Sequence, residues 1–593
     1  MTPSIVSTTP YQVKQDHYSK YDQNIASGKY HPLTSTSFFL GLLPFLAFFL
    51  FVPPNSRFHN LFTRYVVFAA VLSWHIYMLT CFQARSTVVG FGVGITSAWG
   101  TLWAATLLVF RDAKVEFKRV EQRLIGERDS QQLNGTRHDE GLSGNGTTTQ
   151  RSPRPLRKMA DESNLRQRAH IVDDDAKGSL RLNGSSDGTL DSNSNIEYVW
   201  QSYPTDSTAW HRLRWVADLL TNFRGVGWNW RISGLPSLPL PVQRSLQRTS
   251  PSSSCDAGTL KDTPDSRSGL HRYDTVDSLV KHNLLLFLRG YILVDLLKTT
   301  ANHDPYFFTG DASLPPPAWF QSLLSTLQLP SSLTPSLTHV YRLFISMSFV
   351  WLALRSIFTL GPLIYTGLLS RRHSCLRNIP ILRSLAFFAA NGEAWLYPDA
   401  FASYSTVLSR GLAGWWGAWW HQLFRFAFQS SGEFAAAVLR LDQKSMMGKV
   451  VVTTTVFVVS GLVHASGSIA LATVTQTRPW TGSLAFFAVQ PVALMAEIVV
   501  QGWVKKSGIA ARTPRRVGML VRFLYVHAWF YVTAGLLVDD FARGGVWTFE
   551  PIPFSLFRGL GMGIEGDGFW CIRGKVAWWH RNNEKWWLSG VAL

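Results

Sequence analysis

Long apolar runs separated by polar segments dominate the pattern of this chain. Seven runs carry few charges, and they cover 37–52, 65–82, 87–110, 339–369, 449–474, 481–503 and 517–538. Most have about the 20 residues that an α-helix needs to cross a hydrocarbon core of about 30 Å. A shorter run, 284–297, contains Arg289 and Asp295, so it crosses a membrane only if both face protein. The pattern therefore predicts an all-α integral membrane protein, a multispanning bundle of about eight transmembrane helices.

The stretch 111–280 has a different composition, rich in Ser, Asn, Gly, Asp and Arg. Such a sequence buries too little apolar surface to offset the entropy of ordering, so we expect a largely disordered loop. Within it, the segment near 210–230 alternates aromatic, basic and aliphatic residues, which is typical of a tryptophan-rich interfacial anchor. The chain thus divides into 1–110, an N-terminal tail with three transmembrane helices, the polar loop, and a core at 281–593.

The formal net charge of +19 is distributed beside and between the apolar runs instead of in one basic domain. This distribution indicates membrane topology and gives no sign of nucleic-acid binding. Placing the basic groups in the cytosol gives a consistent alternation, with the N-terminus in the lumen, provided that 284–297 crosses. Because the first 36 residues are polar, no cleavable signal peptide is apparent, and the first span would act as the anchor. The sequons at Asn134, Asn145 and Asn183 would then lie in the cytosol and stay unmodified.

Several common chemistries find no support in the sequence. Cys81, Cys255, Cys375 and Cys571 are scattered, without the paired spacing of a zinc site or a disulfide framework, so we expect no structural metal. The chain has no Walker-type phosphate loop and no Gly-x-Ser-x-Gly elbow.

His464 is the first candidate for chemistry, because it lies in the middle of the apolar run 449–474. Ionisable groups inside spanning helices usually face a bundle interior or a water-filled cavity. The alternative is a neutral histidine bonded to a neighbouring helix. Small residues at Gly461 and at 465–468 could leave room for a substrate beside the imidazole, or they could let helices approach closely.

His421 is the second candidate, at the end of the segment Gly414-Trp-Trp-Gly-Ala-Trp-Trp-His421. Tryptophans prefer the membrane interface, which places this segment at the cytosolic boundary. The chain between the two histidines is long enough to return both to one cavity. In the next span, Gln490 and Glu497 share a helical face. They could support the site by orienting His464, or they could make ordinary interhelical hydrogen bonds.

Together these residues fit acyl transfer in a central tunnel. A neutral imidazole can accept the proton of an alcohol as it attacks a thioester, which contributes about 10² to 10⁴ in rate. His421 could hold the alcohol or the developing oxyanion. Arg410, Arg425 and Lys444 could meet the phosphates of coenzyme A from the cytosol, although the same charges serve equally well as topology signals.

The element Trp-Trp-x-x-Trp-Trp-His421, followed by the intramembrane Ser-Gly-Leu-Val-His464, resembles the paired signature of membrane-bound O-acyltransferases. The resemblance is greatest to the wax synthase branch, with its fungal terpenoid acetyltransferases. Further matches are Arg224-Gly-Val-Gly-Trp-Asn-Trp230, Asp295 with Asp304-Pro-Tyr-Phe307, and Gln490 with Glu497. The chain departs from the wax synthase pattern at Gly414 and Gly417-Ala418, where acidic and basic residues are expected. Neither the usual local ion pairs nor the acyl-chain length can be inferred from this segment.

The resemblance implies a multi-pass enzyme of the endoplasmic reticulum in which His464 is the catalytic histidine and His421 occupies the other signature position. It predicts O-acetylation of a hydroxyl on a hydrophobic, terpenoid-like metabolite. The expected partners are acetyl-CoA as co-substrate, the alcohol and the lipid bilayer, with no permanently bound cofactor and no nucleic acid. The alternatives are a long-chain wax or sterol ester synthase, and a non-enzymatic transporter or scaffold.

Overall fold

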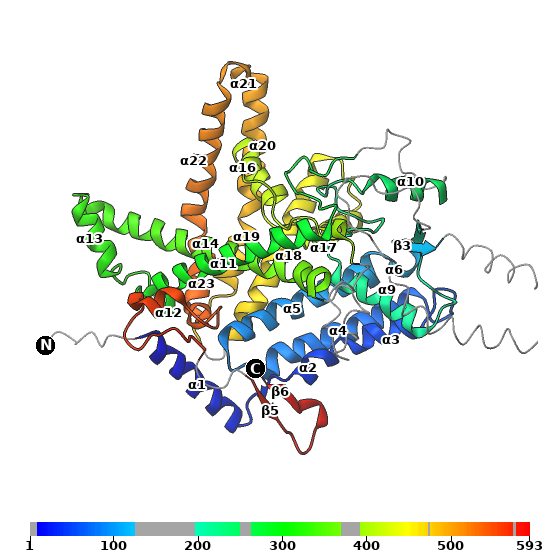
Figure 1. Cartoon of the computed structure of the whole chain (residues 1–593), viewed down its shortest axis with the longest axis horizontal. Helices are drawn as coiled ribbons and strands as arrows, with labels where there is room; N and C mark the ends of the chain where they lie inside the picture. The colour runs from blue at the N-terminus through cyan, green and yellow to red at the C-terminus, as the bar shows by residue number, and fades with distance from the viewer. Residues whose placement is uncertain are drawn as a thin grey trace, which may run out of the picture. The chain divides into compact units, whose positions relative to one another are not determined.

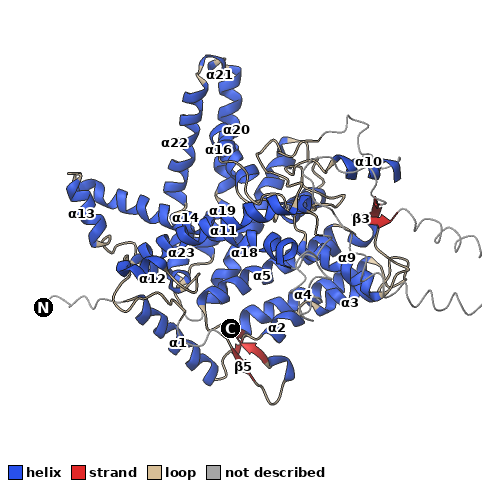
Figure 2. Ribbon diagram, in the orientation of Figure 1, coloured by secondary structure: helices blue, strands red, loops and turns tan. Residues whose placement is uncertain are grey.

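The computed structural model of the protein describes residues 9–124, 196–249, 262–368, 392–472, 475–572 and 577–592. It has two compact units, one formed by Met1–Val120 with Trp200–Leu593 and the other by Glu121–Val199. Helices dominate the described ranges (Figures 1 and 2), and strands occur there only in two-stranded sheets. The three sequons, Cys255, Cys375 and about half of the predicted disordered loop lie outside these ranges, as do some of the predicted cytosolic basic groups.

The N-terminal elements confirm two of the three predicted spans. In chain order they are α1 Pro10–Ala26, β1 His31–Pro32, α2 Ser35–Leu40, α3 Leu43–Phe51, α4 Leu61–Cys81, β2 Phe82–Gln83, α5 Thr87–Ala105, the π-helical η1 Thr106–Phe110 and α6 Ala113–Glu116. The expected first span at 37–52 stays a prediction, because this stretch forms two short helices, α2 and α3, separated by Gly41 and Leu42. The nine residues of α3 cover only about 14 Å, which is too little to cross a bilayer.

The middle of the chain contributes β3 Arg119–Leu124, β4 Ile196–Gln201, α9 Ala209–Thr221, α10 Leu240–Thr249, α11 Val276–Asn302, α12 Tyr306–Thr309, α13 Ala318–Thr326, η3 Ser331–Leu333, α14 Thr334–Pro362 and η4 Leu363–Leu368. The segment near 210–230 differs from the interfacial anchor that the sequence predicted. Trp215 of α9 is fully buried and Trp228 is 1% exposed, in a cluster that includes Phe49 and Trp103. These tryptophans pack against other aromatic side chains in the protein interior and do not lie at the membrane surface.

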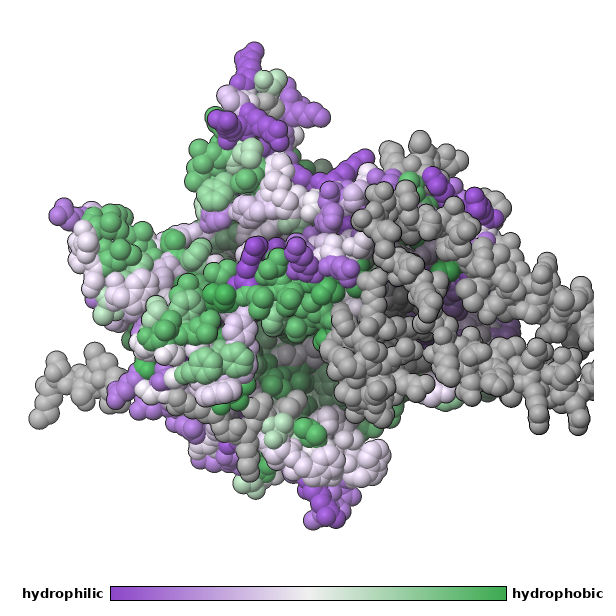
Figure 3. Space-filling view, viewed as in Figure 1, coloured by the Kyte–Doolittle hydropathy of each residue, from purple (hydrophilic) through white to green (hydrophobic). Residues whose placement is uncertain are grey.

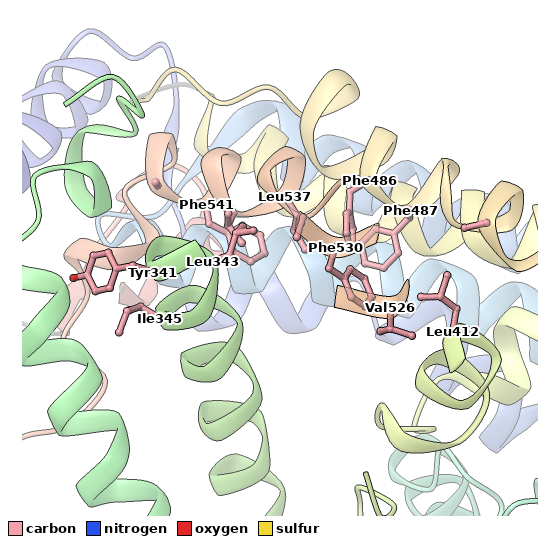
Figure 4. Packing of buried hydrophobic residues seen from close by; sticks show 14 of the residues in the cluster. Tyr341, Leu343, Ile345, Leu412, Phe486, Phe487, Val526, Phe530, Leu537 and Phe541 are labelled. Atoms are coloured by element: carbon pink, nitrogen blue, oxygen red, sulfur yellow. The ribbon is translucent and has the colours of Figure 1, made fainter. Parts of the chain in front are cut away.

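The C-terminal half carries η6 Ala394–Leu396, α16 Ser405–Gly414, η7 Trp415–Trp419, α17 Arg425–Val438, α18 Met446–Leu471, η8 Trp480–Leu484, α19 Ala485–Ala488, α20 Gln490–Lys506, α21 Ile509–Arg512, α22 Arg515–Thr533 and α23 Gly535–Arg543. It closes with η9 Val546–Thr548, η10 Arg558–Met562, β5 Trp578–His580, η11 Trp586–Leu588 and β6 Gly590–Ala592. Its main hydrophobic cluster joins α14, α16, α19, α22 and α23 (Figure 4).

Within the described residues, five helices are long and apolar enough to cross a membrane: Leu61–Cys81, Thr87–Phe110, Ser331–Thr366, Met446–Leu471 and Trp480–Lys506. The pair α22 and α23, bent by 41°, makes a sixth if it counts as one span. The run 284–297 lies inside the continuous helix α11, where Asp295 is buried but Arg289 is exposed. A membrane crossing there required both charged side chains to face protein, and only Asp295 does so. The total of about eight spans and the central tunnel stay predictions.

The small residues around His464 serve close helix packing. A Cβ on Gly94 of α5 would lie 2.4 Å from the Ser466 carbonyl oxygen of α18, so the two backbones touch at this crossing. Ser466 also donates to the Gly94 carbonyl over 2.8 Å. On another side of α18, Ser468 donates to the buried carboxylate of Asp540, which links this helix to α23. The helix that carries His464 is thereby fixed on two sides.

Candidate active site

The tryptophan-rich segment, which we define as residues 411–421, begins with a sharp kink at Gly411. This residue has φ +64° and ψ −138°, a conformation that favours glycine because a side chain would be strained there. A Cβ at this position would also lie 1.7 Å from Oε1 of Glu497. The kink therefore requires glycine both for its backbone angles and for the space that Glu497 occupies.

Glu497 binds the backbone directly after the kink. Its Oε1 accepts from the Leu412 amide over 3.2 Å, and its Oε2 accepts from the Ala413 amide over 3.0 Å. Because the kink interrupts the helix, these amides lack their usual carbonyl partners, and a carboxylate is a strong substitute for them. From the sequence, Glu497 either orients His464 or makes an ordinary interhelical hydrogen bond. The structure places its carboxylate on the tryptophan-rich segment instead.

Gln490, the first residue of α20, binds the same segment. Its Oε1 accepts from Nε1 of Trp416 over 3.3 Å and from Nε1 of Trp529 in α22 over 3.0 Å. Its Nε2 donates to the Phe486 carbonyl over 2.8 Å. The side chain is fully buried. This amide therefore joins the tryptophan-rich segment, α19 and α22, and its bonds are again not to His464.

Gln422 fixes the backbone just before His421. Its Nε2 donates to the carbonyls of Trp416 and Trp420 over 3.0 and 2.6 Å, and its Oε1 accepts from Nη1 of Arg425 over 3.2 Å. Sequence reasoning missed this residue. A glutamine beside tryptophans carries no distinctive spacing, and its role depends on the π-helical turn that exposes the two carbonyls.

The ring of His421 is enclosed by aromatic side chains. Phe358, Phe401, Trp420 and Phe424 lie with their ring centroids 5.3 to 5.9 Å from that of the imidazole. Its Nδ1 is buried and has no hydrogen-bond partner among the described residues. An unpaired buried nitrogen costs about 1 to 3 kcal/mol, so this atom is suited to a polar group that a substrate would supply.

Burial, followed by smaller effects of His464 and Arg224, lowers the pKa of His421 to about 3. His421 is therefore uncharged at physiological pH and can offer one donor and one acceptor nitrogen. That the two histidines singled out in the sequence meet in one cavity stays a prediction.

His464 presents one nitrogen for chemistry. Its Nδ1 lies 2.8 Å from the Ser460 carbonyl oxygen of the same helix. A carbonyl only accepts, so Nδ1 carries the proton and the neutral ring keeps a lone pair on Nε2. The ring lies 4.3 Å from that of Phe487, and the residue is half-buried, not sealed. The alternative of a histidine bonded to a neighbouring helix does not hold, since this bond stays within α18.

A cavity of about 410 Å³ adjoins the enclosure of His421. Phe358, Phe401 and Phe424 belong to its wall, whereas neither His421 nor His464 does. Its polar lining includes Asp218, Asn222, Arg224, Asn283, Arg355, Tyr397 and Asp399. The volume falls within the usual range of small-molecule sites. Asn283, Arg355 and Asp399 went unnoticed in the sequence, because only the fold brings α11, α14 and the loop before α16 to one place.

Arg224, part of the predicted motif 224–230, is held in this cavity wall. Its Nη1 and Nη2 each donate over 2.6 Å, to the carbonyls of Asp399 and Pro398. Burial lowers the pKa of Arg224 to about 10, which leaves the guanidinium charged at neutral pH. The motif therefore has a structural basis: it fixes a cation next to His421.

Of the three cations expected to meet coenzyme A, the structure brings two together. Arg425 donates to the Gly417 carbonyl over 3.0 Å, and burial and then the neighbouring Arg410 lower its pKa. Within the described ranges neither arginine has a carboxylate partner. Lys444 lies past the far end of α17, about 20 Å from Arg425 by helix rise. No group of His, Cys, Asp or Glu in the described ranges could hold a metal ion.

Comparison with known proteins agrees with this geometry. Residues 397–489 match the membrane bound O-acyl transferase family, and this stretch contains both histidines and the tryptophan-rich segment. No solved structure matches the chain. The resemblance predicted from the residues is confirmed, and with the apolar helices it identifies an integral membrane protein.

The chain is also similar to fungal proteins named as acetyltransferases. It is 29% identical over 170 residues to acetyltransferase pyr8 of Aspergillus fumigatus, covering 28% of this chain and 39% of the relative. It is 28% identical over 179 residues to acetyltransferase eriL of Hericium erinaceus, covering 30% and 44%. The matched part thus spans less than half the length of these relatives.

Two glycines of the tryptophan-rich segment allow a matched test of the kink. In Gly411→Ala the new methyl group meets the Glu497 carboxylate at positive φ, so we expect a loss of at least 2 kcal/mol in stability and misplacement of His421. In Gly417→Ala the new methyl meets only Nη2 of Arg410 at 3.7 Å, so we expect little change. Thermal unfolding of both purified variants measures the difference. Equal midpoints would contradict the assigned role of the kink.

Proposed function

We propose that the protein is an integral-membrane O-acyltransferase that transfers acetyl from acetyl-CoA to a hydroxyl of a hydrophobic, terpenoid-like acceptor. The observation that carries this proposal is the pair of neutral histidines, His464 with a free Nε2 and His421 with an unpaired buried Nδ1. The confirmed resemblance to membrane-bound O-acyltransferases and the names of the fungal relatives support it. Location in the endoplasmic reticulum belongs to the same proposal.

In the proposed reaction, Nε2 of His464 accepts the hydroxyl proton as the alcohol oxygen attacks the thioester carbonyl carbon. A carbon–oxygen bond forms, and the carbonyl oxygen becomes an oxyanion to which the neutral His421 donates a hydrogen bond. The tetrahedral intermediate then breaks its carbon–sulfur bond. The coenzyme A thiolate takes the proton from the His464 imidazolium, so that the products are the ester and free coenzyme A.

The acyl donor would approach past Arg410 and Arg425. Two adjacent arginines without a carboxylate partner repel each other, and a bound phosphate relieves that repulsion. Both lie against Gly417, four residues before His421, so an anion bound there would hold the thioester near the histidines. The cavity beside His421, with its aromatic wall and polar lining, suits the acceptor alcohol.

Replacing His464 with Ala should reduce acyl transfer by about 10² or more without lowering the amount of protein in the membrane. His527 of α22 provides a matched control, because its Nδ1 also bonds a carbonyl four residues earlier, over 2.8 Å, on an exposed face. His527→Ala should retain full activity. Purified membranes are assayed with acetyl-CoA against a panel of lipophilic alcohols, and ester products are identified by mass.

The same assay with palmitoyl-CoA distinguishes the alternatives. Esters formed mainly from palmitoyl-CoA would indicate a wax or sterol ester synthase. Unchanged transfer by His464→Ala would remove this histidine from the mechanism, and no ester with any alcohol would favour a transporter or scaffold.

Arg410→Gln should raise the KM for acetyl-CoA by about tenfold with little change in kcat, because one charge-assisted phosphate contact contributes about 1 to 2 kcal/mol. Lys444→Gln removes an equal charge about 20 Å from Arg425 and should leave the KM unchanged. Initial rates across acetyl-CoA concentrations measure both. A rise in KM for Lys444→Gln alone would reverse this assignment of the donor site.

A further inference from the structure

The hairpin formed by α20, α21 and α22 projects away from the other helices of its unit (Figure 1). Its base is buried and its outer part is not. In α20 the last buried side chain is Glu497, and in α22 the first is Val526. The outer halves of both helices therefore bury no side chain fully in the part of the chain that the structure describes.

The end of this hairpin carries a cluster of basic side chains, which we call the basic tip: Lys505, Lys506, Arg512, Arg515 and Arg516. All five residues are exposed, and none forms an ion pair among the described residues. The sequence has no Asp or Glu from 498 to 538, so the charge has no local compensation. Figure 3 shows hydrophilic side chains gathered at this end of the hairpin.

The two arms below the basic tip expose large apolar side chains. Val499, Val500 and Trp503 on α20 are exposed, and so are Val521 and Leu524 on α22. Apolar arms that end in bare cations fit helices that lie in a bilayer and reach its surface. Trp503 is 63% exposed and lies between the apolar arm and the lysines, where interfacial tryptophans are typically found. A soluble anion would explain the cations but not the apolar arms.

We propose that the basic tip binds the phosphate groups of anionic phospholipids in the leaflet that the hairpin reaches. Arginine forks match phosphate oxygens in pairs, and the lysines add point charges. Each basic residue close to an anionic membrane surface contributes about a fivefold gain in affinity. The expected cytosolic placement of 505–516 puts the basic tip on the side where anionic lipids are concentrated.

Native mass spectrometry of the full-length protein tests this inference, after exchange into an equal mixture of phosphatidylcholine and phosphatidylglycerol. The wild-type protein should retain phosphatidylglycerol selectively. The variant Arg512→Gln/Arg515→Gln/Arg516→Gln should lose at least tenfold of that selectivity. The control Lys29→Gln/Arg581→Gln/Lys585→Gln removes the same charge from three exposed positions elsewhere and should behave as wild type.

Equal selectivity in the tip variant and wild type would overturn the proposal, and so would an equal loss in the control. Displacement of the lipid by soluble coenzyme A would assign the tip to the acyl donor instead and would also overturn it. If the tip variant does not yield folded protein, a salt titration of the wild type decides. Retention unchanged between about 0.05 and 0.5 M salt excludes headgroup binding by exposed cations. Acyl transfer is not measured, so this result is independent of the proposed function.

Discussion

The carboxylate of Glu497 is the contact on which the site depends most. It accepts hydrogen bonds from the two backbone amides that follow the kink at Gly411. It also occupies the space that any larger residue at 411 would fill. A helix break inside a membrane protein is stable only when its free polar groups are bonded internally. Glu497 supplies those bonds, and the chain can then turn so that its tryptophans pack on the core and His421 lies among aromatic rings that border the cavity.

The other parts of the site follow from that turn. Gln490 ties Trp416 to α22, and Gln422 fixes the carbonyls of Trp416 and Trp420, just before His421. Both are satisfied amides in a buried setting, where an unpaired group would be costly. The segment is therefore rigid without metal ligands or disulfides among the described residues. The helix that carries His464 is fixed separately, by Gly94 and Asp540.

The sequence predicted the helical class, several spans, both histidines and the resemblance to O-acyltransferases. Hydropathy over 20 residues and an imidazole in an apolar run are local signals, so they can be found without the fold. Local signals also gave a wrong prediction. The aromatic segment around Trp215 and Trp228 has the composition of an interfacial anchor, but both tryptophans are buried among other aromatic rings. The bonds of Glu497 and Gln490 to the tryptophan-rich segment, and the cavity residue Asn283, depend on long-range packing that no spacing encodes.

Cross-linking most directly tests whether the two histidines share one site. In protein with Cys81, Cys255, Cys375 and Cys571 replaced by serine, a short bifunctional thiol reagent is applied to the pair His421→Cys/His464→Cys. The account predicts a linked peptide that joins positions 421 and 464, and none for the control pair Lys444→Cys/His464→Cys. Separate labelling of both cysteines without any linked peptide would contradict it, because the two imidazoles would then act in different places.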